Sequence, residues 1–391
     1  MGDMMISLRR NIRLLNPVWI LLFCGAGYGT TSLAAGMVWA WGGNDSGQLG
    51  IGTVDTRHYT TPIKVNGLTD ISAVAARFDV SLALKTDGTV WVWGDNGMGL
   101  LGDGTSVGRS NPVKISGLAG VIAIAGGRYH SLALKADGSV WAWGDNVNGQ
   151  LGDGTRSSQL NPVQVNGLAD VIAIAGGRYH SIALKADGTV WAWGENVDGE
   201  LGDGTTIRHL NPVKVNSLVG IAAITAGGDH NLALKADGSV WAWGSNRNGQ
   251  VGDGTSINRT NPVRVNAFDG IVSIAAGGDH SLAVKVDGTV WAWGFNWAGQ
   301  LGDGTTIDQL KPVKIPGLSG MVNVAVGHYF SLALKSDGTV WAWGPNQDGQ
   351  LGDGTMTNRL SPVQVQGLVG VSALAGGNDH SLAVVDFAPT K

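Results

Sequence analysis

One histidine recurs at the same point of a repeated string along this 391-residue chain. Histidine is a common metal ligand and a proton carrier near neutral pH, so a ring of histidines could hold a metal ion. However, Val80 and Phe330 replace it in two repeats, and bonds of about 2 Å are too short to join equivalent positions of separate repeats. We therefore expect no metal site, and we expect packing or turn-bonding roles for His130, His180, His230, His280 and His380.

A second recurrent group is the aspartate of the string Leu-Gly-Asp-Gly-Thr, in which Val251 once replaces the leucine. A calcium loop needs several oxygen ligands close together, whereas each string supplies one carboxylate. Aspartate before glycine is typical of a turn in which the side chain bonds its own backbone. We interpret in this way Asp103, Asp153, Asp203, Asp253, Asp303 and Asp353.

The remaining signals of enzyme chemistry are weak. Residues 97–102 match the glycine pattern of dinucleotide-binding loops, but no helix is expected after them to hold a pyrophosphate. The sequence contains no phosphate-binding P-loop, no nucleophile elbow and no His-Glu-x-x-His zinc motif. We therefore predict no catalytic residues, no cofactor and no enzymatic activity.

These residues are positioned by a repeat of about 50 residues. The motif Trp-x-Trp-Gly begins at Trp39, Trp91, Trp141, Trp191, Trp241, Trp291 and Trp341. One unit has four strand-like runs, at 112–115, 121–125, 130–135 and 139–143, with Asp137-Gly138 as the hairpin turn before the last. No apolar period of 3.6 residues, the mark of a helix, appears in the unit. Four antiparallel strands per repeat predict an all-β fold, a seven-bladed β-propeller over residues 35–391.

The two ends of the repeated region complement one another. Residues 37–42 hold only the last run of a unit, and residues 362–385 hold the first three. We predict that the N-terminal strand completes the C-terminal blade and closes the ring, because closure removes the open sheet edges that promote aggregation.

The first 34 residues have the composition of a secretory signal peptide: a basic region, an apolar run at 18–24 and small residues at 32–34. The apolar run is too short for a comfortable membrane span, although an uncleaved anchor is the alternative. The only cysteine, Cys24, lies in this segment. We therefore expect a secreted or periplasmic protein, or one at the cell surface, with no stable membrane span after cleavage.

The charge balance bears on partners. The net charge is −4 and only 14% of residues are charged, so nothing favours binding to nucleic acid, which lysine and arginine usually drive. We expect a monomer whose partner is another protein.

The segment AGGRYHSLALKADGSVWAWGDNVNGQLGDG, residues 125–154, resembles the regulator of chromosome condensation repeat. The resemblance rests on Gly126-Gly127, His130 with Ser-Leu-Ala-Leu after it, Trp143-Gly144, Asn146 and residues 149–152, and it covers about residues 37–385. It implies a seven-bladed propeller. Members share the blades but differ in function, and they include a nucleotide-exchange factor, a plant photoreceptor and a secreted bacterial inhibitor of β-lactamases.

Two departures narrow the function that this resemblance implies. The chain has no wedge-like insertion of the kind found in exchange factors, and Arg128-Tyr129 stands where the photoreceptor has tryptophans. A signal segment and a regular ring are similar to the secreted bacterial inhibitors, which bind their partner through the loop-bearing face. We therefore expect an exported protein-binding scaffold. The alternatives are a guanine-nucleotide exchange or regulatory protein of this family and a glycan-binding propeller.

The residues that vary between repeats are those we consider for binding. The antiparallel connections place the Gly-Gly-x-x turns and the long loops after each Trp-Gly on one face of the ring. If the strand rich in alanine and glycine is innermost, the turns surround the central opening, with one arc of arginine and aromatic residues and another that is mostly acidic. Such polarity could orient a partner, although drift on a solvated rim is the alternative. The predicted partner-binding residues are Arg77, Phe78, Arg128, Tyr129, Arg178, Tyr179, Asp229, Asp279, Tyr329 and Asp379, and weaker candidates are Met98, Arg247, Phe295 and Trp297.

Overall fold

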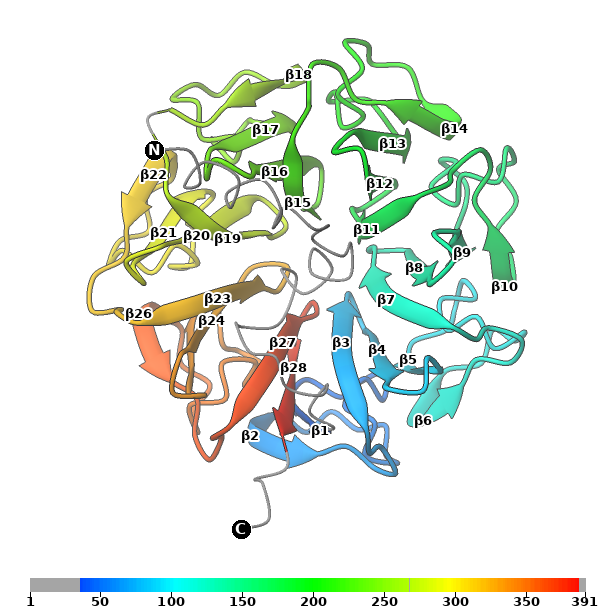
Figure 1. Ribbon diagram of the computed structural model, residues 1–391. Coiled ribbons are helices and arrows are strands. Elements are labelled where there is room, and N and C mark those ends of the chain that lie inside the picture. Colours follow the sequence, from blue (N-terminus) through cyan, green and yellow to red (C-terminus); the bar gives the residue numbers. More distant parts are fainter. Residues whose placement is uncertain (1–35, 267, 387–391) are drawn as a thin grey trace, which may run out of the picture.

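Alternating apolar residues and tight glycine turns fold each repeat into an antiparallel β-sheet, and the sheets stand around a central axis as seven blades (Figure 1). The computed structural model describes residues 36–386 except residue 267. All regular elements of these residues are β-strands, which confirms the predicted all-β propeller. In these ranges no helix is long and apolar enough to cross a bilayer.

Within each blade the strands follow one another from the centre of the ring to its rim. Blade 1 contains β3 (Ile71–Arg77), β4 (Val80–Lys85), β5 (Val90–Gly94) and β6 (Arg109–Lys114). Blade 2 contains β7 (Val121–Gly126), β8 (His130–Lys135), β9 (Val140–Gly144) and β10 (Gln159–Gln164). Blade 3 contains β11 (Val171–Gly176), β12 (His180–Lys185), β13 (Val190–Gly194) and β14 (His209–Lys214). Blade 4 contains β15 (Ile221–Ala226), β16 (His230–Lys235), β17 (Val240–Gly244) and β18 (Arg259–Arg264).

The other three blades have the same plan. Blade 5 contains β19 (Ile271–Ala276), β20 (His280–Lys285), β21 (Val290–Gly294) and β22 (Gln309–Lys314). Blade 6 contains β23 (Met321–Val326), β24 (Ser331–Lys335), β25 (Val340–Gly344) and β26 (Arg359–Gln364). Blade 7 combines β27 (Val371–Gly376) and β28 (His380–Asp386) with β1 (Gly36–Gly42) and β2 (Tyr59–Lys64).

Blade 7 closes the ring with strands from both ends of the described chain. Strand β1 pairs with β28 over its whole length, from Gly36 opposite Asp386 to Gly42 opposite His380. Strand β2 then pairs with β1. The sequence predicts three C-terminal strands and one N-terminal strand, so this division is wrong: there are two from each end. The reason is that the proline-containing run of each unit is the outermost strand of the preceding blade, where proline's missing N–H is tolerated.

The innermost strand of every blade is the one rich in alanine and glycine. Strands β3, β7, β11, β15, β19, β23 and β27 contact one another in turn around the axis. Small residues permit this crowding: a Cβ atom on Gly176 would lie 2.6 Å from the backbone nitrogen of Gly127 in the neighbouring blade. The Gly-Gly pairs of the repeat are therefore needed where the blades converge.

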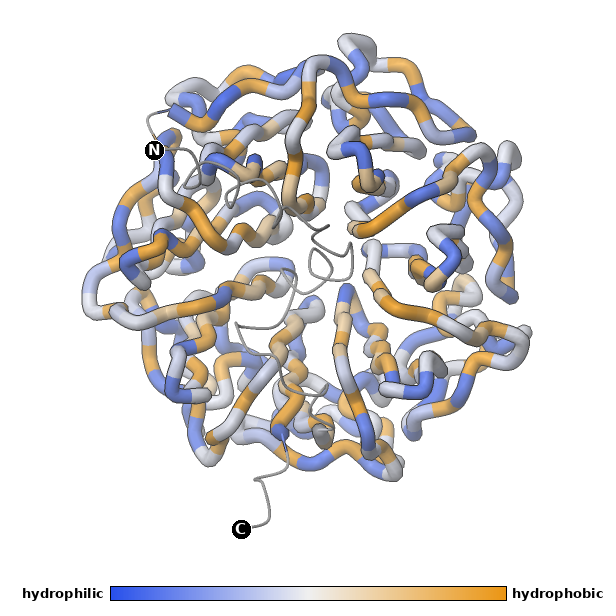
Figure 2. Tube along the Cα trace, viewed as in Figure 1, coloured by the Kyte–Doolittle hydropathy of each residue, from blue (hydrophilic) through white to orange (hydrophobic). Residues whose placement is uncertain are grey.

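Tryptophan joins each blade to the preceding one. Trp143 is fully buried, and its Nε1 donates to the backbone oxygen of Leu100 in blade 1 at 2.9 Å. Burial of such a side chain contributes roughly 2–3 kcal/mol. The first tryptophan of the motif, Trp141, is only partly buried, with Lys135 Nζ 5.4 Å from its ring. Apolar residues follow the strands and form clusters that bridge neighbouring blades (Figure 2).

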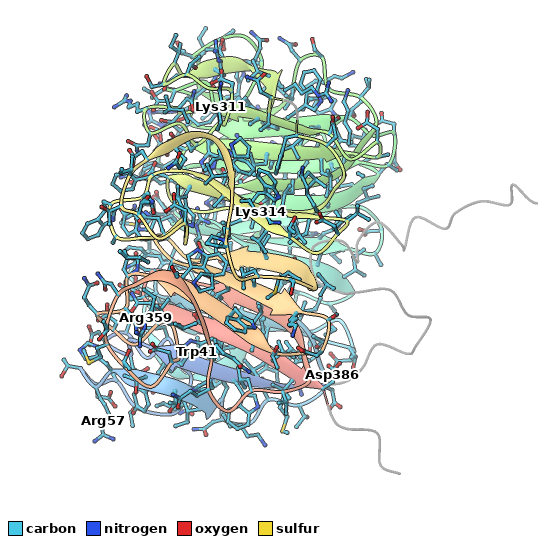
Figure 3. The ribbon with its side chains drawn as sticks, turned by 90° about the vertical axis from the view of Figure 1, so that its left-hand side faces the viewer. Trp41, Arg57, Lys311, Lys314, Arg359 and Asp386 are labelled. Atoms are coloured by element: carbon cyan, nitrogen blue, oxygen red, sulfur yellow. The ribbon has the colours of Figure 1, made fainter. Side chains whose placement is uncertain are left out.

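The ring has two different faces. The turns between the first and second strands and the long loops before the fourth strands lie together, since Asp145 N donates to Tyr129 O at 2.8 Å. We call this side the loop face. The Asp-Gly turns lie on the opposite side. Figure 3 shows the ring from its edge, with Arg57 of a long loop at one face and Asp386, the end of β28, near the other.

Candidate functional site

The recurrent histidines link neighbouring blades. His130 Nε2 lies 2.7 Å from Ser181 Oγ of blade 3, and this hydroxyl donates to the Gln150 carbonyl at 2.8 Å. The histidine must therefore be the donor through Nε2. Burial lowers the pKa of His130 to about 3, so the ring is neutral. The role is structural. His230, His280 and His380 bond a serine of the next blade in the same way, and His180 bonds Asn231 Oδ1 instead.

The recurrent aspartates form turns, as expected. Asp103 Oδ1 accepts from the backbone nitrogen of Thr105 at 3.0 Å and from Asn96 Nδ2 at 3.1 Å. Equivalent bonds are made by Asp153, Asp203, Asp253, Asp303 and Asp353.

On the loop face, the inner turns of neighbouring blades are tied together through their backbones. Arg128 N donates to Gly177 O at 2.9 Å, and Arg178 N donates to Gly228 O at 2.8 Å. The same kind of bond continues through Gly278, His328 and Asn378, whose nitrogens donate to the next turn. The side chains of these turns are therefore held at fixed positions around the central opening.

The structure brings the predicted arginine and aromatic arc together in blades 1 to 3. The rings of Tyr129 and Tyr179 stack with centroids 4.9 Å apart, and Phe78 lies 5.8 Å from Tyr129. The guanidinium carbon of Arg128 is 5.0 Å from the Phe78 ring, and that of Arg178 is 5.3 Å from the Tyr179 ring. Such cation–π contacts contribute about 0.5–1 kcal/mol each at exposed sites, so the arc is preorganised.

The acidic residues lie in two groups rather than one arc. Asp229 is 3.6 Å from Arg178, and Asp279 lies nearby in blade 5. Burial, and then the charge of Asp229, raise the pKa of Asp279 to about 6. Asp379 lies in blade 7 beside Asp79, and its pKa is raised to about 7 by burial and then by Asp348 and Asp79. The mostly acidic arc expected from the sequence therefore has Asp229 and Asp279 on one side of blade 6 and Asp379 on the other.

Tyr329 of blade 6 separates the two acidic groups. Its ring lies 3.9 Å from that of His328 and 6.5 Å from that of Phe295, a loop residue of blade 5. Of the weaker candidates, Trp297 is 53% exposed, Met98 is also exposed, and Arg247 pairs with Asp198 at 3.2 Å.

Arg77 differs from the other predicted residues because it is the last residue of β3 and is only 9% exposed. It occupies the position of the glycine three residues before the histidine or its replacement in the other turns, such as Gly127. At Gly127 a Cβ atom would lie 2.2 Å from His130 Cε1, whereas in blade 1 the histidine is replaced by Val80. The side chain at 77 fits for this reason.

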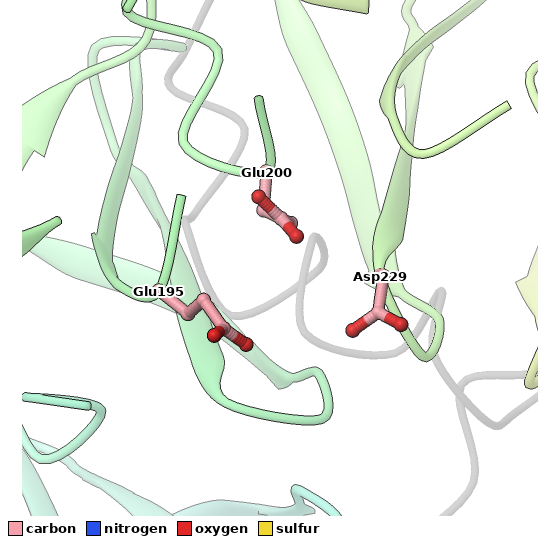
Figure 4. A group of neighbouring side chains, drawn as sticks. All are labelled: Glu195, Glu200 and Asp229. Atoms are coloured by element: carbon pink, nitrogen blue, oxygen red, sulfur yellow. The ribbon is translucent and has the colours of Figure 1, made fainter. Parts of the chain in front are cut away.

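Sequence reasoning missed one cluster on this face. Carboxylate oxygens of Glu195, Glu200 and Asp229 all lie within 4.8 Å of one another (Figure 4). Glu200 is only 2% exposed, and burial raises its pKa to about 8. The sequence contains one signal of this cluster: the residue equivalent to Glu200 is a glutamine in five other repeats. Glu200 already accepts the backbone N–H of Asp198 at 2.9 Å, so we assign no ion to the cluster.

Comparison with known proteins identifies the repeat. A family model described as RCC1-like domain matches residues 9–321. Models described as the Regulator of chromosome condensation (RCC1) repeat match residues 321–350 and 337–384. The resemblance noted from the sequence is confirmed.

Individual relatives match short stretches. The Protein RCC2 homolog of Danio rerio is 42% identical over 74 residues, 18% of this chain and 14% of that protein. The X-linked retinitis pigmentosa GTPase regulator of Mus musculus is 38% identical over 93 residues, 23% of this chain and 9% of that protein. The E3 ubiquitin-protein ligase HERC2 of Homo sapiens is 36% identical over 85 residues, 21% and 2% of the two chains. The chain thus spans a small part of the length of these relatives.

Among solved structures, Prp20p from Saccharomyces cerevisiae has a TM-score of 0.84 over 96% of each chain at 24% identity. That structure was described together with the binding of Prp20p to Gsp1p and histones. At this identity the likeness shows the propeller fold alone.

These relatives correct the expected location. They are named as RCC2 proteins and as a GTPase regulator, and such regulators work inside the cell. The prediction of a secreted or periplasmic protein, or one at the cell surface, is therefore wrong. The predicted signal segment, residues 1–34, lies outside the described residues. The relatives are regulators more often than enzymes, although one is a ubiquitin ligase.

Proposed function

The chain belongs to the family of RCC1-like domains, and from this premise we propose that it is a regulatory propeller that binds a protein partner through the loop face. The observation that carries the proposal is the arc of Arg128, Tyr129, Arg178 and Tyr179, in which two cations lie over stacked rings. Arginine and tyrosine are frequent hot spots of protein interfaces, since they combine a large apolar surface with directed hydrogen bonds.

The fixed geometry of the arc supports this role. The turns that carry it are joined by backbone hydrogen bonds, so little side-chain or loop entropy would be lost on binding. The adjacent acidic group around Asp229 gives the surface two signs of charge, which favours one orientation of a partner.

Apolar side chains on the same face support a protein partner rather than a small solute. Exposed apolar residues on a soluble protein often mark contact surfaces. On the long loops of this face they are Val54, Met98, Val107, Val147, Val197, Ile207, Ile257, Trp297, Ile307 and Met356.

Partner capture with a charge-reversed arc tests the proposal. The variant Arg128→Glu/Arg178→Glu should lose at least about tenfold of a partner recovered by the unchanged protein, because both arginines would then repel the groups that they now attract. A matched control is Lys114→Glu/Lys214→Glu, which reverses two exposed cations at the outer strand ends away from this face. Equal recovery of every partner by all three proteins would remove the loop face as the binding site.

Regulation of a small GTPase is a second candidate, favoured by the names of the relatives, one of which is a GTPase regulator. The test is release of a fluorescent guanine nucleotide from small GTPases of the same organism. Acceleration that is lost in Arg128→Glu/Arg178→Glu would support the exchange role. Unchanged release across the panel would leave partner binding without nucleotide exchange.

A further inference from the structure

Arg77 is a buried cation without a partner in the described part of the chain. Its side chain forms no hydrogen bond or ion pair there, although the residue is only 9% exposed. An unpaired buried charge is costly, because it loses water without gaining a counter-charge. Burial, and then the charge of Arg128, lower the pKa of Arg77 to about 10, so the guanidinium remains positive at neutral pH.

The guanidinium of Arg77 lies near the axis of the ring. After burial, its positive charge is among the causes that lower the pKa of histidines in five other blades, from blade 2 to blade 6. These effects across the ring agree with the walls of the pocket that Arg77 lines, which come from five blades.

Arg77 opens into a small pocket at the centre of the loop face. Its walls are Arg77, Phe78, Arg128, Gly228, His328 and Asn378, which come from blades 1, 2, 4, 6 and 7. Two further nitrogens of this wall, Arg128 Nε and His328 Nδ1, are buried and have no hydrogen-bond partner among the described residues. The pocket therefore gathers unused hydrogen-bonding nitrogens around two guanidinium groups.

The nearby carboxylates are engaged elsewhere. Asp229 pairs with Arg178 at 3.6 Å, and Asp279 accepts from Gln250 Nε2 at 3.3 Å. They reduce the positive potential at the axis, but neither forms an ion pair with Arg77 or Arg128. A compact anion at the axis would meet the guanidinium groups of Arg77 and Arg128. Neither group forms a direct ion pair with another described residue.

We propose that Arg77 and Arg128 form an oxyanion-binding site at the central opening of the loop face, which takes a carboxylate or phosphate group. Guanidinium groups bind both, because their N–H fork matches paired oxygens. The bound oxyanion is either an acidic side chain of the protein partner or a free phosphate ion. The first alternative rests on the proposed function.

Calorimetric titration tests the site with two probes. The first is sodium phosphate, with sodium chloride of equal ionic strength as the reference. The second is an end-blocked peptide with a single glutamate, compared with its glutamine counterpart. Binding of phosphate alone identifies a free ion, whereas binding that needs the glutamate identifies an acidic segment of a partner.

Two variants remove the axial charge in different ways. Arg77→Gly/Val80→His restores the turn found in five other blades, with Ser131 placed to accept from the new histidine as Ser181 accepts from His130. Arg77→Met removes the charge and keeps much of the volume. The control is Arg57→Met, which removes an exposed arginine of a loop on the same face.

The expected result is that both Arg77 variants weaken binding of the effective probe at least about tenfold while Arg57→Met leaves it unchanged. The proposal is overturned if neither probe binds the unchanged protein, or if the Arg77 variants bind as well as it does. Partner capture separates this result from the proposed function. A partner lost in Arg128→Glu/Arg178→Glu but kept in both Arg77 variants would leave the protein-binding face standing without the axial site.

Discussion

His380 and Ser81, which are 299 positions apart in the sequence, form a 2.8 Å hydrogen bond across the junction of blade 7 and blade 1. Ser81 Oγ also donates to the Gln48 carbonyl at 2.8 Å, so His380 Nε2 is the donor. His130 and Ser181 make the same bond between blades 2 and 3. The junction between the two ends of the described chain therefore has the same chemistry as an internal one.

This equality predicts that the contacts between the two ends of the described chain, here called the closing junction, stabilise the ring as much as an internal junction does. Trp41 is fully buried between blades 6 and 7 and donates to Gln350 O at 2.8 Å, as Trp243 does to Glu200 O. Trp41→Ala and Trp243→Ala should each lower the free energy of unfolding by about 3–5 kcal/mol. Denaturant titration of both variants measures this. If the closing junction is dispensable, the midpoint of denaturant unfolding will be unchanged in Trp41→Ala but lowered in Trp243→Ala.

Replacement of Glu200 should stabilise the protein, and more so at high pH. Burial raises the pKa of Glu200 to about 8, above its unfolded value of about 4.5, so its contribution is favourable at low pH and is lost as pH rises through 8. Glu200→Gln removes this loss and could donate to Asp229, as Gln250 donates to Asp279. We expect a gain of roughly 2 kcal/mol or more at pH 9 and a smaller one at pH 5. Melting temperatures across pH measure it, and Gln150→Glu, the reverse change in blade 2, should show the opposite trend.

The buried histidines should make the ring sensitive to acid. Burial lowers the pKa of His130 to about 3, below the unfolded value of about 6.5. Its contribution to stability is therefore complete above pH 6.5 and is lost as pH falls toward 3. His130→Gln, which keeps an N–H donor but cannot titrate, should reduce the slope of melting temperature against pH between these values. Ser181→Ala keeps the titrating ring, so an equal reduction in that variant would contradict this explanation.

Removal of the axial charge should stabilise the protein in the absence of a ligand. Arg77 is buried without a direct ion pair in the described ranges, and Asp229 and Asp279 offset its charge only in part, so Arg77→Gly/Val80→His should raise the free energy of unfolding by about 1–3 kcal/mol. Denaturant titration in chloride buffer is the measurement. A lower stability in this variant would mean that Arg77 is satisfied inside the free protein.

The repeat made the architecture predictable, whereas the partition of strands among blades was not. Seven Trp-x-Trp-Gly motifs predict seven blades, and the glycine turns predict their hairpins. The proline-containing strand follows a long loop. It belongs to the preceding blade if that loop stays within one blade, and to the next blade if the loop connects two blades. Spacing alone does not distinguish these cases, so the closing blade was divided wrongly.

The residues of the candidate site were predictable from the sequence as a set of turn residues. Most of the contacts among them depend on the three-dimensional structure. The stack of Tyr129 on Tyr179 joins equivalent positions of adjacent blades, so repeat alignment points to it. The buried state of Arg77 depends on the loss of a histidine three positions later. The approach of Glu200 to Asp229 depends on a loop of one blade reaching the turn of the next.

The division of blade 7 has a consequence for synthesis. Of the described strands, β1 and β2 are made first and their partners β27 and β28 are made last. During all of that time the hydrogen-bonding edge of β1 that later meets β28 has no native partner. Internal blades can form as their residues emerge, whereas β1 can pair with β28 only after all the described strands between them have been made. Unpaired strand edges can pair with strands of other chains. Slow translation, or truncation that removes β27 and β28, should therefore favour misassembly at the edge of β1 that pairs with β28.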